Sequence, residues 1–121
     1  MKRDMDLVRK ILLAMNDHEH GFVMEELELD GYTQEQIGYH CFLLDEAGLI
    51  QASDVSTDDT PSPCALPVRL TWEGHEFIEN AQNDKVWGQA KEAVGKIGDV
   101  SFSVWASVLS QIVMSNLGIG N

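Results

Sequence analysis

Apolar residues recur at helical spacing in several parts of the chain, and this pattern predicts a mainly helical protein. Thr33 followed by Gln36 matches a capping box, which marks a helix start, and Gly48 is placed to end that helix. Thr71 and Asp84 are predicted to cap two further helices. The predicted helices cover residues 5–16, 33–47, 72–83, 85–95 and 103–117.

The same spacing predicts which side chains of two helices are buried. Helix 33–47 is predicted to bury an inner stripe formed by Ile37, Cys41 and Leu44. In helix 72–83, the residues predicted near the buried side are Trp72, His75, Phe77 and Ile78.

Two short strands are predicted between the helices, over residues 49–52 and 67–71. Together they form a β-hairpin whose tip, residues 53–66, is rich in Ser, Thr, Asp and Pro. The tip is predicted to be mobile because it has almost nothing apolar to bury. Residues 22–29 fit either a short strand or a single helical turn. The predicted fold class is therefore mainly α with a small β-hairpin.

Length and composition indicate one folded domain. The chain has 121 residues, of which 44% are hydrophobic and 23% charged, as in globular proteins. We expect a core over residues 1–83, followed by C-terminal helices over residues 84–121.

Because no apolar run is long enough to cross a membrane and the start is charged, a cytoplasmic location is expected. Cys41 and Cys64 are too few for a disulfide framework and are expected to be free thiols.

The formal net charge of −12 is distributed unevenly along the chain. Every charged residue between Ile11 and Val68 is Asp or Glu. The basic residues are Lys2, Arg3, Arg9, Lys10, Arg69, Lys85, Lys91 and Lys96. An acidic surface repels nucleic acid and anionic membranes alike. The charge therefore favours a protein partner, disfavours DNA and excludes a membrane.

Helix 33–47 is the candidate partner-binding element. Opposite its inner stripe, helical spacing places Glu35, Tyr39, Phe42 and Glu46 on the outer face. The two carboxylates would repel DNA phosphates, whereas exposed aromatic side chains are typical of protein contacts. Without Lys or Arg, the helix offers only Gln34, Gln36 and His40 for contacts with bases. The alternative is that Tyr39 and Phe42 are covered by the hairpin or the last helix.

A second candidate surface consists of basic residues near the start of the chain. These residues are Lys2, Arg3, Arg9 and Lys10. Because Asp4 and Asp6 dilute the patch, we interpret it first as a solvated helix end that pairs with the acidic body. In the alternative interpretation, the four side chains contact DNA phosphates in a dimeric regulator.

The last predicted helix is the candidate for self-association, because its apolar face is wide for a surface helix. The residues that form this face are Trp105, Val108, Leu109, Ile112 and Val113. The alternative is ordinary packing against Leu7, Ile11 and Met15. Both interpretations stay open: the face forms a homodimer, or it packs within the chain.

No catalytic, metal or cofactor site is assigned from the sequence. His18, Glu19 and His20 lie in a predicted loop, and no second pair has the spacing of zinc ligands. Cys64 has no base or cation nearby to activate it. Gly120 belongs with the stop of the last helix rather than with a phosphate-binding loop. We therefore expect a protein that is not an enzyme and needs no cofactor.

Four stretches of the chain resemble a family of small bacterial and prophage proteins classed as a domain of unknown function. They are the opening MKRDMDLVR (1–9), the pair Tyr39 and His40 with the later EAGLI (46–50), and LTWEGHEF (70–77). The resemblance covers nearly the whole chain and implies a winged-helix-like fold with C-terminal helices and an association with phages or other mobile elements. Phe42, where we expect a polar residue, and the long acidic hairpin tip depart from it.

These observations predict a winged-helix-like, non-enzymatic acidic protein that acts by binding a protein partner in a phage or mobile-element setting. A sharper hypothesis is an inhibitor whose carboxylates mimic nucleic acid and occupy the DNA site of a host protein. The alternative is a winged-helix transcriptional regulator that binds DNA as a dimer. Fold analogy favours the regulator, whereas charge opposes it.

Overall fold

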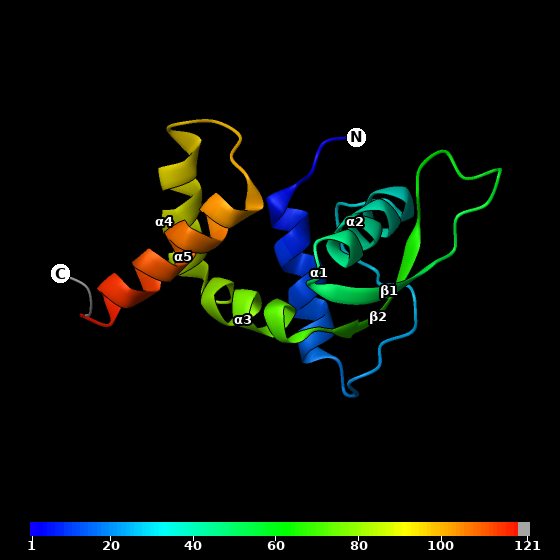
Figure 1. Cartoon of the computed structure of the whole chain (residues 1–121), viewed down its shortest axis with the longest axis horizontal. Helices are drawn as coiled ribbons and strands as arrows, with labels where there is room; N and C mark the ends of the chain where they lie inside the picture. The colour runs from blue at the N-terminus through cyan, green and yellow to red at the C-terminus, as the bar shows by residue number, and fades with distance from the viewer. Residues whose placement is uncertain (119–121) are drawn as a thin grey trace. The chain divides into compact units, whose positions relative to one another are not determined.

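The computed structural model describes residues 1–118 and divides the chain into two compact units, Met1–Ile78 and Glu79–Asn121. The described helices and strands are α1 (Met5–Asp17), α2 (Gln34–Glu46), β1 (Ile50–Asp54), β2 (Ala65–Leu70), α3 (Trp72–Ala81), α4 (Asp84–Gly95) and α5 (Phe102–Asn116) (Figure 1). The predicted fold class, mainly helical with a small β-hairpin, is confirmed. Gly120, which we assigned to a helix stop, lies outside the described residues.

Helix α1 contributes five buried apolar side chains to the core of the first unit. Asp4 caps the helix, with its carboxylate accepting a hydrogen bond of 3.1 Å from the Leu7 amide. The apolar stripe then faces α2 and β2, which both contact α1. Its buried members are Leu7, Val8, Ile11, Leu12 and Met15. Burial of such a stripe is the main source of stability for a helix of this length.

Helix α2 begins and ends as its sequence predicts. The Thr33 hydroxyl accepts from the Gln36 amide, and the Gln36 side chain accepts from the Thr33 amide, which completes the capping box. At the other end Gly48 adopts a φ of 79°, a left-handed conformation that glycine tolerates best. Ile37, Cys41 and Leu44 are buried, so the predicted inner stripe is confirmed.

The hairpin extends further than predicted. Antiparallel pairing runs from Ile50 opposite Leu70 to Asp54 opposite Ala65, with an irregularity in register between Gln51 and Ala52. Beyond the strands, further hydrogen bonds join positions 55 and 56 to position 64. The loop is therefore shorter than the predicted tip, because backbone pairing does not require apolar side chains on both strands.

Residues 22–29 form neither of the predicted structures. The segment is irregular, and two of its amides bond to β2: Val23 to the Val68 carbonyl at 2.8 Å and Met24 to the Pro67 carbonyl at 3.0 Å. Met24 has a φ of 50°. A left-handed residue interrupts the repeating extended backbone, so pairing with β2 stops after these two bonds.

Helix α3 turns a different face inward from the one predicted. Thr71 caps it as expected, with its hydroxyl accepting from the Gly74 amide at 3.1 Å. Phe77 and Ile78 are buried, but Trp72 is 76% exposed and His75 is exposed as well. The prediction for these two residues is wrong because Gly74 takes the inward position in the first turn. A Cβ atom there would collide with the Leu49 carbonyl oxygen, so only glycine allows this close approach.

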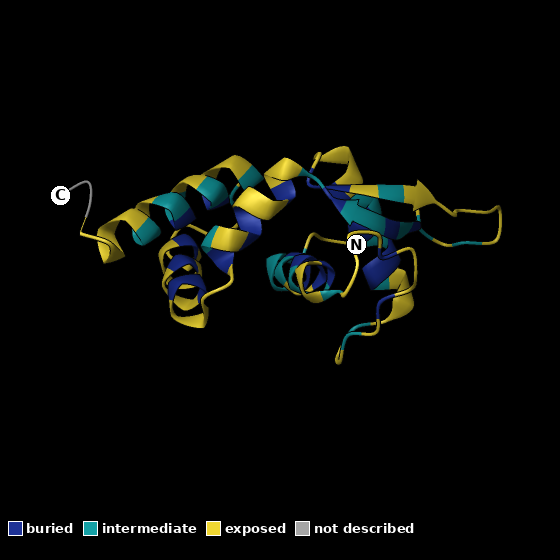
Figure 2. Cartoon of the chain, turned by 90° about the horizontal axis from the view of Figure 1, so that it is seen from below, coloured by how far each residue is buried: buried dark blue, intermediate teal, exposed yellow. Residues whose placement is uncertain are grey.

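The second unit is a packed pair of helices, α4 and α5. The indole rings of Trp87 and Trp105 stack between them, with centroids 4.8 Å apart and planes inclined by 22°. Asn83, rather than the predicted Asp84, caps α4 and accepts from the Val86 amide at 3.1 Å. Asn83 still has extended backbone geometry, which makes Asp84 the first helical residue. Figure 2 shows how far each residue of the chain is buried.

Candidate functional site

The outer face of α2 carries the four residues that the sequence singles out for partner binding. Glu35 and Glu46 are exposed, and Tyr39 and Phe42 are half-buried. The aromatic side chains are thus partly covered, and along the helix they lie between the two carboxylates, which are about three turns apart. This face combines apolar contact area with negative charge, and it has no basic group of its own.

Both ends of α2 are fixed to the hairpin. Near its start, the Ser62 hydroxyl donates to the Glu35 carboxylate at 3.3 Å, and the Cys64 sulfur lies where a side chain at Gly38 would otherwise be. Near its end, the Asp45 carboxylate accepts from the Ala52 amide at 3.1 Å. The hairpin and α2 therefore present their acidic side chains from one joined surface.

Exposure of the carboxylates is the main electrostatic feature of the first unit. All twelve acidic residues between Ile11 and Val68 are exposed. They lie on α1, α2, β1, the hairpin tip and the segment between α1 and α2. At the base of the tip, hydrogen bonds from the Ser56 side chain and amide lower the pKa of Asp54, which holds this carboxyl in its anionic form.

The three polar residues of α2 suited to base contacts are all engaged inside the protein. Gln34 donates its side-chain amide to the Leu27 carbonyl at 2.8 Å, and Gln36 completes the capping box. His40 is 1% exposed. Its Nε2 accepts from the Asp4 amide at 2.9 Å, and its Nδ1 donates to the Gln36 carbonyl at 2.8 Å. Each of these side chains therefore already has a hydrogen-bond partner within the protein, although Gln34 is exposed.

The basic residues at the start of the chain are in different environments. Lys2 and Arg3 are exposed before α1, Arg9 is half-buried, and Lys10 is exposed. The Lys10 ammonium lies 5.7 Å from the ring centroid of Tyr32, within the range of a cation–π contact. Lys10 thus contacts an aromatic ring of the protein itself.

The residues assigned to self-association differ in how far they are buried. Trp105 and Leu109 are buried, and Trp105 stacks on Trp87 of α4. Val108, Ile112 and Val113 are half-buried and keep some accessible surface. Intramolecular packing with α4 therefore uses part of the predicted self-association face.

The two cysteines are free thiols, as predicted. Burial raises the pKa of Cys41 to about 12, with a further contribution from Cys64. Burial also raises the pKa of Cys64, and the carboxylates of Glu26 and Asp54 add to the effect. Both shifts favour the protonated thiol, which is a poor nucleophile.

The histidine loop after α1 forms local interactions. The Nε2 atom of His18 lies 3.2 Å from a carboxylate oxygen of Glu25, and Nδ1 accepts from the His20 amide at 3.1 Å. Among residues 1–118, no group of three or more His, Cys, Asp or Glu side chains is arranged to hold a metal ion. Nor is any helix in that part of the chain long and apolar enough to cross a membrane.

Fold and surface define a small, mainly helical protein whose first unit is strongly acidic. The family model described as "Hypothetical protein (DUF2513)" matches residues 2–100, and the chain belongs to this family. It is also similar to an "Uncharacterized protein" of Haemophilus influenzae, with 36% identity over 97% of this chain and 99% of the relative. No solved structure matches the chain. The predicted resemblance to a domain of unknown function is thereby confirmed.

Proposed function

We propose that this protein is a non-enzymatic acidic binding module that engages a basic surface of a protein partner through the outer face of α2. The observation that carries the proposal is that all twelve acidic residues between Ile11 and Val68 are exposed, with no Lys or Arg among them. An electrostatic field of one sign steers an oppositely charged partner toward the protein and raises the rate at which the two associate. Tyr39 and Phe42 supply apolar contact area within that field.

The hydrogen bonding of α2 favours a protein partner over DNA. Gln34, Gln36 and His40 are committed to partners inside the chain, and the outer face carries Glu35 and Glu46 instead. DNA affinity at physiological salt depends on cations that neutralise phosphates. A helix with this outer face repels phosphates.

We further propose a winged-helix-like arrangement of α1, α2 and the hairpin, and a role in a phage or mobile-element setting. In the sharper form of the proposal, the carboxylates imitate the phosphates of nucleic acid and occupy the DNA site of a host protein. The exposed acids on α2 and on the adjoining hairpin support this form, since both elements are joined by the Ser62 to Glu35 hydrogen bond.

The experiment that tests the proposal is capture of host proteins on the immobilised chain at physiological salt, followed by elution with increasing NaCl. The test variant is Glu35→Gln with Glu46→Gln, and the control is Glu73→Gln with Glu79→Gln, two exposed positions of α3 that give the same change in net charge. We expect salt-sensitive retention that is lost in the test variant and kept in the control. Retention that is equal in both variants, or insensitive to salt, contradicts the proposal.

Labelled duplex DNA, including the upstream region of the gene, tests the competing function by fluorescence anisotropy. We expect no saturable binding at physiological salt. Saturable binding that disappears when Lys2, Arg3, Arg9 and Lys10 are replaced by Ala would instead establish a DNA-binding regulator.

A further inference from the structure

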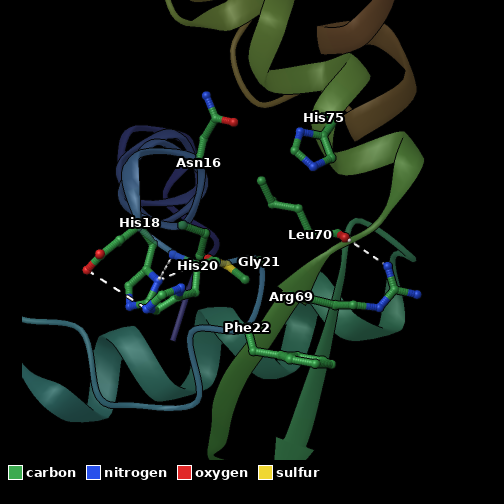
Figure 3. A pocket seen from close by; sticks show the side chains of 10 residues that line it. Asn16, His18, His20, Gly21, Phe22, Arg69, Leu70 and His75 are labelled. Carbon is green, nitrogen blue, oxygen red and sulfur yellow. Dashed lines mark hydrogen bonds and ion pairs between the residues drawn. The ribbon is translucent and has the colours of Figure 1, made fainter.

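A groove on the first unit lies apart from the outer face of α2 and has a different chemical character. It has a volume of about 740 Å³ and is formed by the end of α1, the loop that follows, the end of β2 and the first turn of α3. Figure 3 shows Asn16 and His75 on one side and the imidazoles of His18 and His20 on another. This volume is in the range of sites for small molecules.

The groove gathers groups that can donate hydrogen bonds to an anion. Three of the four histidines of the chain line it, together with Arg69, the only Lys or Arg between Lys10 and Lys85. Glu19 is the single carboxylate among its lining residues. The rest of the first unit between α1 and β2 displays only acidic charge. The groove is therefore the part of this acidic surface that gathers imidazole and guanidinium groups.

These side chains differ in how many hydrogen bonds they already make within the protein. Arg69 donates through Nε to the Gln51 side chain and through an Nη to the Leu70 carbonyl, so part of its five-donor guanidinium remains for a ligand. His18 is held by Glu25 and by the His20 amide. The exposed imidazole of His75, on the opposite wall, is the donor best placed to contact a ligand.

The apolar part of the groove is held in place by the backbone. Phe22 is 61% exposed, although the next residue, Val23, is only 7% exposed and is bonded to β2. Met24 adopts a left-handed φ of 50°, which is unfavourable for a residue with a side chain. The bonds of Val23 and Met24 to β2 fix this conformation and so fix the position of Phe22. Phe22 and Leu70 both line the groove and supply part of its apolar surface.

We propose that the groove binds a small organic anion with a flat apolar portion. The apolar portion lies against Phe22 and Leu70, and the carboxylate, sulfonate or phosphate group accepts hydrogen bonds from His75 and Arg69. A nucleic acid strand does not fit this site, because its continuing phosphates would meet the exposed carboxylates of Glu19, which lines the groove, and Glu25, which contacts His18.

The test uses the dye 8-anilinonaphthalene-1-sulfonate as probe and N-phenyl-1-naphthylamine as its neutral counterpart, which has the same rings and no sulfonate. We expect saturable fluorescence enhancement with the anionic dye and weaker binding of the neutral one. His75→Ala, which removes the donor, should lower affinity for the anionic dye by about tenfold, the effect of losing one hydrogen bond to a charged group, and leave the neutral dye unchanged.

Phe22→Ala should weaken both dyes, since both place rings against Phe22. The matched control is Trp72→Ala, which removes an aromatic side chain that is 76% exposed and does not line the groove. Circular dichroism verifies that each variant is folded. Absence of saturable binding, equal affinity for the two dyes, or a loss in Trp72→Ala as large as in Phe22→Ala would overturn the proposal.

Discussion

At the scale of single residues, His40 is the one polar or charged residue that is buried among residues 1–118. The imidazole is almost fully buried between α1 and α2, and both ring nitrogens have hydrogen-bond partners. The Asp4 amide that donates to Nε2 belongs to the residue whose carboxylate caps α1. One histidine therefore ties the start of α1 to the second turn of α2, and burying it is tolerable because neither nitrogen is left unsatisfied.

The two thiols are predicted to differ in reactivity. Cys41 is buried and its pKa is raised to about 12, so its thiol stays protonated at pH 8. Cys64 is half-buried and easier to reach. Iodoacetamide at pH 8 should modify Cys64 first and leave Cys41 intact in the folded protein, as measured by mass spectrometry of peptides. In urea both should react, and faster labelling of Cys41 under native conditions would contradict this packing.

At the scale of elements, two glycines in helices illustrate how position decides the role of a residue. Gly74 allows the first turn of α3 to lie against Leu49, and Gly88 in α4 has open space where a Cβ atom would be. Helical propensity alone treats the two glycines alike. The packing of α3 on the Leu49 carbonyl makes them different.

Gly74→Ala and Gly88→Ala should therefore have opposite effects on the free energy of unfolding. Ala at position 74 collides with a backbone atom and should destabilise the protein by about 1–3 kcal/mol. Ala at position 88 should stabilise it by about 0.5–1 kcal/mol, because it lowers the entropy lost on helix formation. Urea denaturation measures both values. Stabilisation by Gly74→Ala would show that α3 does not approach Leu49 as described.

At the scale of the whole molecule, charge is the dominant property. Twenty acidic residues face eight basic ones, and the basic residues lie outside the stretch from Ile11 to Val68. Carboxylates in that stretch have few cations to pair with, so they repel one another in the compact state. Added salt should screen this repulsion.

Raising NaCl from about 10 mM to about 150 mM should increase the free energy of unfolding by about 0.5–1 kcal/mol, since the screening length shortens from about 30 Å to about 8 Å. Thermal denaturation followed by circular dichroism measures the change. KCl at the same ionic strength is the control and should give the same shift, because screening does not distinguish the two cations. A midpoint that falls with salt would indicate that attractive ion pairs dominate instead.

The sequence alone determined those features that depend on local spacing and backbone chemistry. The five helices, the capping box at Thr33 and the stop at Gly48 were all predictable, because hydrophobic period and capping act within a few neighbouring residues. The exposure of Glu35 and Glu46 on the outer face of α2 follows from the same spacing. The net charge and its concentration in the middle of the chain require no structure at all.

Only the tertiary structure decided which residues far apart in the sequence contact one another. The inward position of Gly74, which places Trp72 and His75 outside, depends on the Leu49 carbonyl, 25 residues away. Likewise, His40 links α2 to α1 only because the Asp4 amide donates a hydrogen bond to it. The irregular backbone of residues 22–29 depends on hydrogen bonds to β2. The groove brings together side chains from position 15 to position 75, and no local pattern could indicate it. Such features arise from packing between distant segments. The spacing of apolar residues along the chain does not specify that packing.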